Sequence, residues 1–408
     1  MEKVKKLNPF KRLYCRIFQG VFKIALPLLP YKDPKIINKI VEVPAVLKQN
    51  GKTKPLIVTD KTIRSLALTL PLEEKLIEEN ISYSVFDEVV ANPTTDNVAD
   101  ALKLYKDSGC DCLIAFGGGS PMDCAKGVGA LVAKPKKTLN KLKGILKVGK
   151  KIPMLVAIPT TAGTGSETTL AAVIVDSQTR HKYAINDFPL IPSYAVLDEE
   201  VTMTLPKPVV ATTGMDALTH AVEAFIGRSG NKGTRADALE AIKLIFENLE
   251  ISYFEGTREA RKNMLVASHK AGRAFSKSYV GYVHALAHAL GGKYNTPHGL
   301  ANAVILPIVL ESYGKSIYKK LWKIAVYCNL ADKNTAYSDG AKIILDKIRE
   351  MNGKFDIPKT LTVKEEDLDA LSGYAEKEAN PLYPVPVLYS RAQLKELYRK
   401  VGNLNGTV

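Results

Sequence analysis

The pattern of apolar residues changes character part-way along the chain. Between about residues 54 and 205, short apolar runs alternate with charged stretches of helical spacing. The runs lie at 55–60, 82–89, 112–116 and 154–161. Repeated strand–helix units predict a parallel sheet flanked by helices. Beyond residue 212 nearly every segment follows helical spacing, so we expect a second domain that is all-helical.

The length of 408 residues favours more than one domain. We expect a basic, amphipathic N-terminal extension (1–45), an α/β dinucleotide-binding domain (46–208) and an all-helical metal-binding domain (209–408). Within the α/β domain, residues 171–176 and 182–187 are expected to form a hairpin-like pair of strands.

The net charge of +15 is compatible with nucleic acid, anionic lipid or phosphate-bearing ligands. No nucleic-acid-binding motif accompanies it, so we expect no nucleic acid partner and assign most of the charge to solvated faces. No apolar run is long enough to cross a bilayer, and the basic start lacks the pattern of a signal peptide. The 5 cysteines include no Cys-x-x-Cys pair, which indicates reduced thiols and a cytoplasmic location.

The N-terminal stretch KRLYCRIFQGVFKIALPLL (11–29) has apolar residues at roughly helical spacing. Such a helix either packs against the body of the protein or touches a membrane surface. We favour packing, because the proline-containing continuation leads directly into the folded domain.

Most of the 6 histidines gather in one region, together with an aspartate. Asp216 and His220 are four residues apart, and so are His284 and His288, with His298 shortly after them. On a helix this spacing places both side chains of a pair on one face. A carboxylate and several imidazoles on neighbouring helices predict a divalent transition-metal site. A buried structural histidine is the alternative for each of them taken singly.

A glycine-rich loop follows the apolar run at 112–116. Gly117, Gly118 and Gly119 precede Ser120, which we expect to cap a helix that has Asp123 in its first turn. Free N–H groups at such a helix start bind a pyrophosphate. The spacing is neither G-x-G-x-x-G nor a Walker loop, and a simple turn is the alternative. A place at the carboxyl end of a parallel strand favours the ligand site.

Two further features support a nucleotide site. The loop PTTAGTGSE (159–167) offers hydroxyl and N–H groups that suit a ribose or a nicotinamide amide. Asp60 closes the first strand, where a carboxylate accepts hydrogen bonds from ribose hydroxyls and repels a 2′-phosphate. This favours NAD over NADP, although Asp60 is also placed to cap the following helix.

Four long motifs resemble the iron-containing (group III) alcohol dehydrogenases, from about residue 40 to the C-terminus. The motifs are GGGSPMDCAK, IPTTAGTGSE, GMDALTHAVEAF and HALAHALGGKYNTPHG. The resemblance implies a dehydroquinate synthase-like architecture, in which an α/β dinucleotide-binding domain precedes an all-helical domain. It also implies a metal held by Asp216, His220, His284 and His298. His288 matches an extra histidine near the substrate, and an imidazole with a pKa near 6.5 is suited to relay a proton. A role as a metal ligand and a purely structural role are the alternatives for His288.

The resemblance further implies which residues contact the cofactor. They are Asp60, Asn92, Gly118, Gly119, Ser120, Thr160, Thr161, Thr169 and Lys182. Gly117 in the glycine-rich loop and Asp123 in the helix after it are expected to contact the cofactor as well.

The expected function is hydride transfer between NAD(H) and a primary or secondary alcohol, or its aldehyde or ketone. We expect Fe(II), with zinc as the alternative ion, NAD in preference to NADP, and a homodimer. Two alternatives stay open: a polyol- or glycerol-type dehydrogenase of the same fold, and a non-catalytic nucleotide-binding protein. The sequence does not identify the substrate, and the loop at 380–390 either borders the active site or only connects helices.

Overall fold

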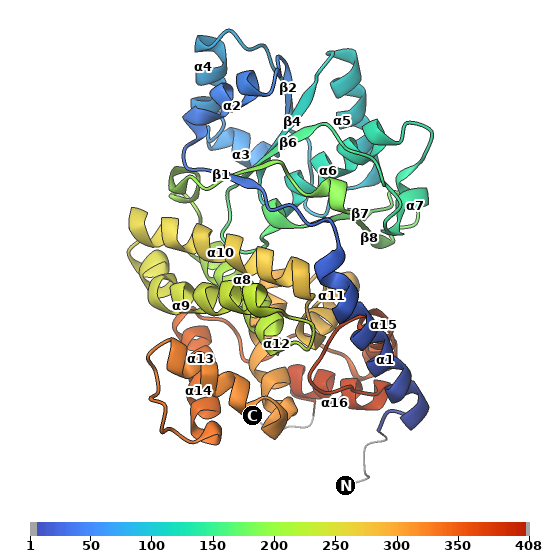
Figure 1. Cartoon of the computed structure of the whole chain (residues 1–408), viewed down its shortest axis with the longest axis vertical. Coiled ribbons are helices and arrows are strands. Elements are labelled where there is room, and N and C mark those ends of the chain that lie inside the picture. Colours follow the sequence, from blue (N-terminus) through green and yellow to red (C-terminus); the bar gives the residue numbers. More distant parts are fainter. Residues whose placement is uncertain (1–5, 405–408) are drawn as a thin grey trace. The chain divides into compact units, whose positions relative to one another are not determined.

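The computed structural model describes residues 6–404, and the chain divides into two compact units. An α/β unit comprises Pro30–Leu205, and a helical unit combines the residues up to Leu29 with those from Pro206 onward (Figure 1). The division expected from the sequence (1–45, 46–208 and 209–408) stays a prediction. The residues before Pro30 contact mainly the helical unit, and the residues from Pro30 onward contact mainly the rest of the α/β unit.

The α/β unit is built on a six-stranded parallel sheet of order β1-β9-β6-β4-β2-β3. The strands are β1 (Lys35–Ile37), β2 (Pro55–Val58), β3 (Ser84–Phe86), β4 (Cys112–Gly117), β6 (Met154–Pro159) and β9 (Tyr194–Val196). The four strands predicted from apolar runs are confirmed as β2, β3, β4 and β6. β1 and β9 were not predicted from the sequence: each has three residues, and unlike β3 neither lies within one of the four apolar runs.

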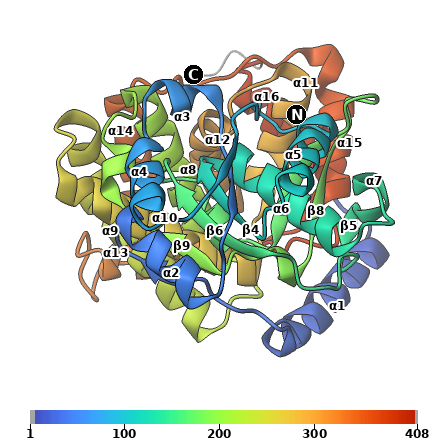
Figure 2. The same ribbon diagram turned by 90° about the horizontal axis from the view of Figure 1, so that it is seen from above.

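Helices cover both faces of this sheet (Figure 2). α2 (Val43–Gln49) and α4 (Leu70–Glu78) pack on one face, and α5 (Thr95–Asp107) and α6 (Gly119–Ala133) on the other. Side chains of β4 alternate between the two cores: Ile114 joins α2 and α4, while Leu113 joins α5 and α6. The side chains on both faces of β4 are fully buried. A strand that is buried on both faces has apolar residues at successive positions, which explains the continuous apolar runs in the sequence. Two short helices, α3 (Lys61–Ser65) and α7 (Leu139–Leu142), complete the unit's α-helices.

The predicted hairpin-like pair is confirmed. β7 (Ala171–Val175) and β8 (Lys182–Asn186) pair antiparallel. With β5 (Gly144–Ile145) they form a separate three-stranded sheet of order β5-β8-β7.

The helical unit confirms the expected all-helical second half. Its helices beyond residue 206 are α8 (Lys207–Ile226), α9 (Lys232–Phe254), α10 (Arg258–Ser278), α11 (Tyr282–Tyr294), α12 (His298–Tyr313), α13 (Tyr318–Tyr327), α14 (Tyr337–Lys354), α15 (Leu368–Ala379) and α16 (Arg391–Val401). α8 packs against α9, α10 and α12, and every residue from Gly214 to Ile226 is buried. A helix that is buried on every side lies at the centre of a bundle.

The N-terminal helix α1 (Pro9–Ala25) belongs to this unit. Gln19 donates to the carbonyl oxygen of Tyr383 at 2.7 Å, and the ring of Phe22 lies 5.1 Å from that of Tyr279. The interpretation that this stretch packs against the protein is therefore confirmed for one face of the helix. Within residues 6–404, no helix combines the length and the apolar character that a bilayer-spanning segment needs.

Candidate metal centre and cofactor loops

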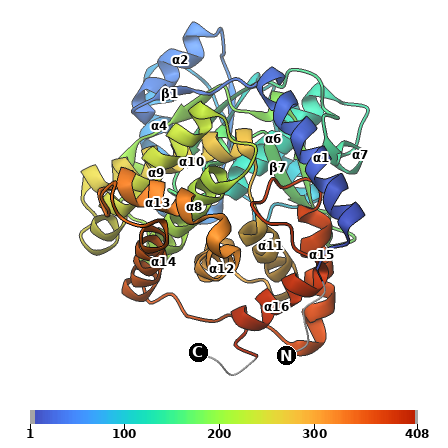
Figure 3. The same cartoon turned by 60° about the horizontal axis from the view of Figure 1, so that its bottom comes forward.

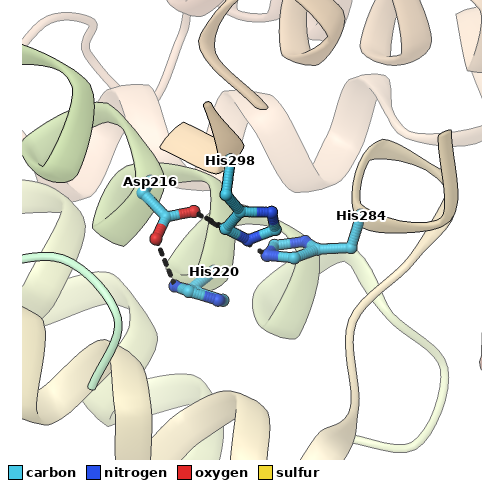
Figure 4. A group of neighbouring side chains, drawn as sticks. All are labelled: Asp216, His220, His284 and His298. Carbon is cyan, nitrogen blue, oxygen red and sulfur yellow. Dashed lines mark ion pairs between the residues drawn. The ribbon is translucent and has the colours of Figure 1, made fainter. Parts of the chain in front are cut away.

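Three helices of the helical unit bring the predicted metal ligands together. Asp216 and His220 lie on α8, His284 lies on α11, and His298 is the first residue of α12. The candidate ligand atoms all lie within 4.8 Å of one another, and the four side chains point toward a common centre (Figure 4). A tetrahedral ion with bonds of about 2.1 Å places its ligand atoms about 3.4 Å apart, so the four groups are close enough to share one ion.

A glycine allows α12 to begin so close to α8. A Cβ on Gly299 would lie 2.3 Å from the carbonyl oxygen of Thr212, which is closer than any side chain permits. Thr212 is one turn before Asp216 on α8. The contact therefore places His298 beside the aspartate, with Nε2 3.4 Å from Oδ1.

The donor set is buried and suited to a divalent cation. Asp216, His220 and His284 are no more than 5% exposed, whereas His298 is partly open to solvent. Burial, followed by the neighbouring rings of His220 and His298, lowers the pKa of His284 well below its usual value. His284 is thus neutral near pH 7, as a metal ligand must be.

Glu223 orients His284 from behind. Its Oε2 lies 2.7 Å from Nδ1 of the ring and also accepts the backbone N–H of Gly281, while Oε1 accepts that of Val283. When Glu223 is ionised it only accepts hydrogen bonds, so Nδ1 of His284 then carries the ring proton and the Nε2 lone pair faces the centre. Burial raises the pKa of Glu223 to about 7, although the N–H donors act to lower it. Glu223 lies one turn beyond His220 on α8 and was not predicted from the sequence.

Asn302 fixes Asp216 from the opposite helix. Its amide donates to Oδ1 of the aspartate at 2.6 Å and lies 3.1 Å from Nε2 of His298 and 3.3 Å from Nε2 of His284. The side chain is fully buried. Asn302 was not predicted from the sequence. Its spacing of four residues from His298 places both side chains on one face of α12 and is the signal that could have identified it.

His288 lies beside the four ligands but has a different partner. Its ring stacks on that of His298 at 5.1 Å, and its Nδ1 lies 2.7 Å from Oε1 of Glu378. The hydroxyl of Tyr383 donates to the same oxygen. Burial raises the pKa of Glu378, but His288 and Tyr383 outweigh this and hold it below its usual value. The loop at 380–390 thus contributes a tyrosine to the surroundings of His288.

In the α/β unit, the candidate cofactor residues follow three neighbouring strands. Asp60 follows β2, the glycine triplet ends β4, and Thr160 and Thr161 follow β6. These strands lie side by side and run parallel, so their carboxyl ends meet at one edge of the sheet. Open α/β sheets bind ligands at this edge.

The glycine loop is tighter than expected. Gly117 has φ +150°, and a Cβ there would lie 2.6 Å from Pro121, so the chain turns at once into α6. Gly118 occupies the N-cap position, and the prediction that Ser120 caps the helix is wrong. Because Gly117 bends the strand end directly into the helix, Ser120 lies inside the first turn, and the prediction that Asp123 lies in that turn is wrong as well.

The second loop lies against the first. A Cβ on Gly118 would meet the Thr161 hydroxyl at 3.5 Å, and one on Gly119 would meet Thr164 at 3.4 Å. The two loops therefore lie in contact, with Thr161 and Thr164 beside the glycines. Their role in binding a nucleotide stays a prediction.

Lys126 braces the second loop from inside. Its fully buried ammonium, on α6, donates to the carbonyl of Ser166 at 2.7 Å, the hydroxyl of Thr169 at 2.8 Å and the carbonyl of Ala171 at 2.9 Å. Asp123 lies beside it and accepts from the Ser166 hydroxyl at 3.3 Å. Burial lowers the pKa of Lys126 to about 8 and raises that of Asp123 to about 6. Asp123 and Thr169 thus lie in an internal polar cluster, and their contact with a cofactor stays a prediction.

The remaining candidates form a connected group. Lys182 donates to the side-chain oxygen of Asn92 at 2.7 Å, and the backbone N–H of Asn92 lies 3.3 Å from the Ser120 hydroxyl. Burial lowers the pKa of Lys182. Asp60 accepts the backbone N–H of Ile63 through Oδ1, so its role as a helix cap is confirmed.

Comparison with known proteins assigns both halves of the chain. Residues 37–199 match the model "Iron-containing alcohol dehydrogenase", and residues 210–402 match "Fe-containing alcohol dehydrogenase family, C-terminal". The chain belongs to the iron-containing alcohol dehydrogenase family. It is thus an oxidoreductase with an Asp–His metal site, in a family that includes NAD-dependent alcohol dehydrogenases. The resemblance drawn from the four motifs is confirmed.

Individual relatives in the iron-containing alcohol dehydrogenase family match over nearly the whole chain. A 1,3-propanediol dehydrogenase of Citrobacter freundii is 36% identical over 387 residues, which cover 93% of this chain and 98% of the relative. The crystal structure of a 1,3-propanediol oxidoreductase superposes with a TM-score of 0.87 at 34% identity, covering 91% of this chain and 99% of that one. A sulfoacetaldehyde reductase from Bifidobacterium kashiwanohense, solved in complex with NAD+, gives 0.80 at 25% identity, covering 91% and 98%. The expected fold is confirmed.

Replacing Lys126 with methionine should loosen the second loop. The methionine keeps the apolar stem but leaves the acceptors around Ser166 and Thr169 without their donor, at a cost of about 3 kcal/mol of unfolding free energy. We expect the Kd for NAD, measured by calorimetry, to rise more than the stability loss alone explains. Lys103→Met, at a lysine whose side chain is 79% exposed, is the matched control and should change neither quantity.

Replacing Glu223 with glutamine should weaken metal binding without removing a ligand. The neutral amide no longer enforces the proton on Nδ1 of His284, and loss of such a partner lowers metal affinity by about 10–100-fold. Competition with a chromophoric chelator measures the change. Glu247→Gln, on the exposed surface of α9, should leave the affinity unchanged, and equal affinities for both variants would contradict the role of Glu223.

Removing the metal should destabilise the protein. An ion present at 100–1,000 times its Kd stabilises the folded state by about 2.7–4.1 kcal/mol. Chelator should therefore lower the thermal midpoint of the wild type, but not that of Asp216→Asn. A wild-type midpoint that is the same with saturating Fe(II) or Zn(II) as with chelator would show that no ion binds the folded state.

Proposed function

We propose that the chain is an Fe(II)-dependent, NAD-preferring dehydrogenase of small alcohols. The observation that carries this proposal is the convergence of three imidazoles and one carboxylate within 4.8 Å. Such a nitrogen-rich set with one carboxylate suits Fe(II) and also binds zinc by affinity order. The family supports iron, and zinc is the alternative to be distinguished by metal analysis of anaerobically purified protein.

The residues at this centre have separable roles. When bound, a divalent ion supplies Lewis acidity that lowers the pKa of a substrate hydroxyl, and oxidised nicotinamide accepts the hydride. Asp216, His220, His284 and His298 would hold the ion. Glu223 keeps His284 in the correct tautomer, and Asn302 holds the carboxylate of Asp216 in place.

His288 is proposed to relay a proton between substrate and solvent. Its side chain is 41% exposed, which gives it contact with solvent, and its Nδ1 lies 2.7 Å from Oε1 of Glu378. Glu378 itself takes a hydrogen bond from Tyr383, so the pair is held in a fixed orientation. His288 stacks on His298, which is one of the four proposed ligands, but is not itself among them.

For the cofactor, we assign the pyrophosphate to the glycine loop from Gly117 to Ser120. Thr160 and Thr161 are assigned to the nicotinamide side, and Asn92 and Lys182 to the remaining polar contacts. Asp60 supports NAD over NADP, because its helix-capping bond uses only Oδ1 and its charge would repel a 2′-phosphate.

The substrate class follows from the relatives. A match of 36% identity to a 1,3-propanediol dehydrogenase favours small primary alcohols, including 1,3-diols, together with their aldehydes. The glycerol-type and the non-catalytic alternatives give different results in the same assay. We further propose a cytoplasmic homodimer.

The test is an assay at 340 nm of alcohols and aldehydes with NAD(H) and NADP(H), prepared anaerobically with and without Fe(II). We expect NAD-linked turnover of 1,3-propanediol and short primary alcohols that depends on added Fe(II). His284→Ala should lower kcat/KM about 1,000-fold, because several kcal/mol of charge stabilisation is lost, while NAD still binds. His181→Ala, at an exposed histidine, is the control. NAD binding without turnover of any alcohol would favour the non-catalytic alternative.

A further inference from the structure

Helix α1 lies outside the residues that match the family, since the first family match begins at residue 37. One of its faces is fastened to the helical unit. Cys15 and Gln19 are buried, Arg16 donates to the carbonyls of Val385 and Pro386, and Lys11 forms an ion pair with Glu376. The helix is therefore held in one orientation beside α15 (Figure 3).

The opposite face of α1 carries an apolar stripe that faces solvent. Its members recur every three or four residues along α1 and into the turn that follows it. They are Phe10, Leu13, Tyr14, Ile17, Val21, Ile24 and Leu28. Each is between 57% and 84% exposed, and at helical spacing all share one side. Single exposed apolar residues are ordinary, but a continuous row of large ones marks an interaction surface.

A basic cluster lies on the other side of α1 from this apolar stripe, because at 3.6 residues per turn Arg12 and Lys23 point away from it. Arg12 and Lys23 are exposed on α1, and Arg228 and Lys323 are exposed on the helical unit. Lys23, Arg228 and Lys323 lie near Lys320, where burial, followed by Arg235 and these three cations, lowers the pKa to about 8. Arg228 and Arg12 lie near Arg16, where burial, followed by these two cations, lowers the pKa.

These cations have few acidic neighbours. Within residues 6–404, no ion pair is found for Arg12, Lys23, Arg228, Lys320 or Lys323. Mutually repelling cations without carboxylate partners favour an anionic surface as their counterpart.

The combination fits a helix that lies in a membrane interface. With 17 residues, α1 is about 25 Å long and lies along the protein surface. Helices of this kind bury an apolar face at the boundary of headgroups and acyl chains, while lysine and arginine contact anionic lipids. Phe10 and Tyr14 on the apolar stripe add the aromatic side chains that membrane interfaces favour.

We propose that α1 docks the protein on an anionic phospholipid surface, with the apolar stripe inserted and the basic residues on the other side of the helix attracted to the lipid phosphates. A second copy of this chain is a poorer occupant. In a two-fold contact through the apolar stripe, two copies of α1 would lie side by side, each with four basic residues and no acidic one, and like charges repel. The proposal goes beyond the dehydrogenase activity and is tested independently of it.

The experiment is cosedimentation of the full-length protein with lipid vesicles. Wild-type protein should bind vesicles of phosphatidylcholine mixed with phosphatidylglycerol, bind pure phosphatidylcholine far less, and be released by salt. Ile17→Ser/Ile24→Ser should lower the partition coefficient about 30-fold, because two inserted side chains lose their apolar gain. Arg12→Gln/Lys23→Gln should lower it about 25-fold on anionic vesicles, at about 5-fold per cation.

Matched control variants distinguish binding through this surface from nonspecific adsorption to the vesicles. Ile77→Ser/Val41→Ser removes equally exposed apolar side chains from the α/β unit, and Lys315→Gln/Lys333→Gln removes exposed lysines elsewhere on the helical unit. Both should bind like the wild type, and all variants should keep wild-type thermal midpoints. The proposal is overturned if wild-type protein ignores anionic vesicles or if the control variants lose binding equally. It is also overturned if the α1 variants change the oligomeric mass in solution and leave vesicle binding unaltered.

Discussion

The charge of the Asp216 carboxylate is the constraint on which the helical unit depends. It lies in the middle of α8 and is 2% exposed, and an isolated buried carboxylate is costly. Asn302 supplies one hydrogen bond, and three imidazoles surround the remaining space. A divalent cation satisfies all of these groups together. The close approach of α12 at Gly299 and the orientation of His284 by Glu223 serve this one arrangement.

In the α/β unit, a buried charged side chain, the ammonium of Lys126, also determines the local structure. Two loops that are rich in glycine, threonine and serine have few side chains to pack, so their shape depends on hydrogen bonds. Lys126 provides them from inside, with a buried ammonium that reaches the backbone at Ser166, Thr169 and Ala171. The loop beside the glycine turn is thereby held from within α6, which leaves its outer surface for a ligand.

Local pattern was enough to predict the main elements and to predict a metal site among Asp216, His220, His284, His288 and His298. The resemblance to the family selected four of these as ligands and set His288 apart. Apolar runs marked four strands of the parallel sheet, and the i, i+4 spacing placed Asp216 with His220 on one helix face. Residues that act through tertiary contacts were missed. Glu223 and Lys126 look like ordinary helix residues in the sequence, and their partners lie 61 and 40–45 positions away. The cap at Ser120 was wrong because the positive φ of Gly117 starts the helix early. For α1, periodicity gave an amphipathic helix, but only the fold shows that its apolar side faces out.

The central claim is that a single ion is bound by three imidazole nitrogens and one carboxylate oxygen. Anomalous diffraction from crystals grown anaerobically with Fe(II), recorded on both sides of the iron edge, tests it most directly. We expect one strong iron peak within bonding distance of Asp216, His220, His284 and His298. A peak held by other side chains, or no peak at full Fe(II) loading, would contradict it.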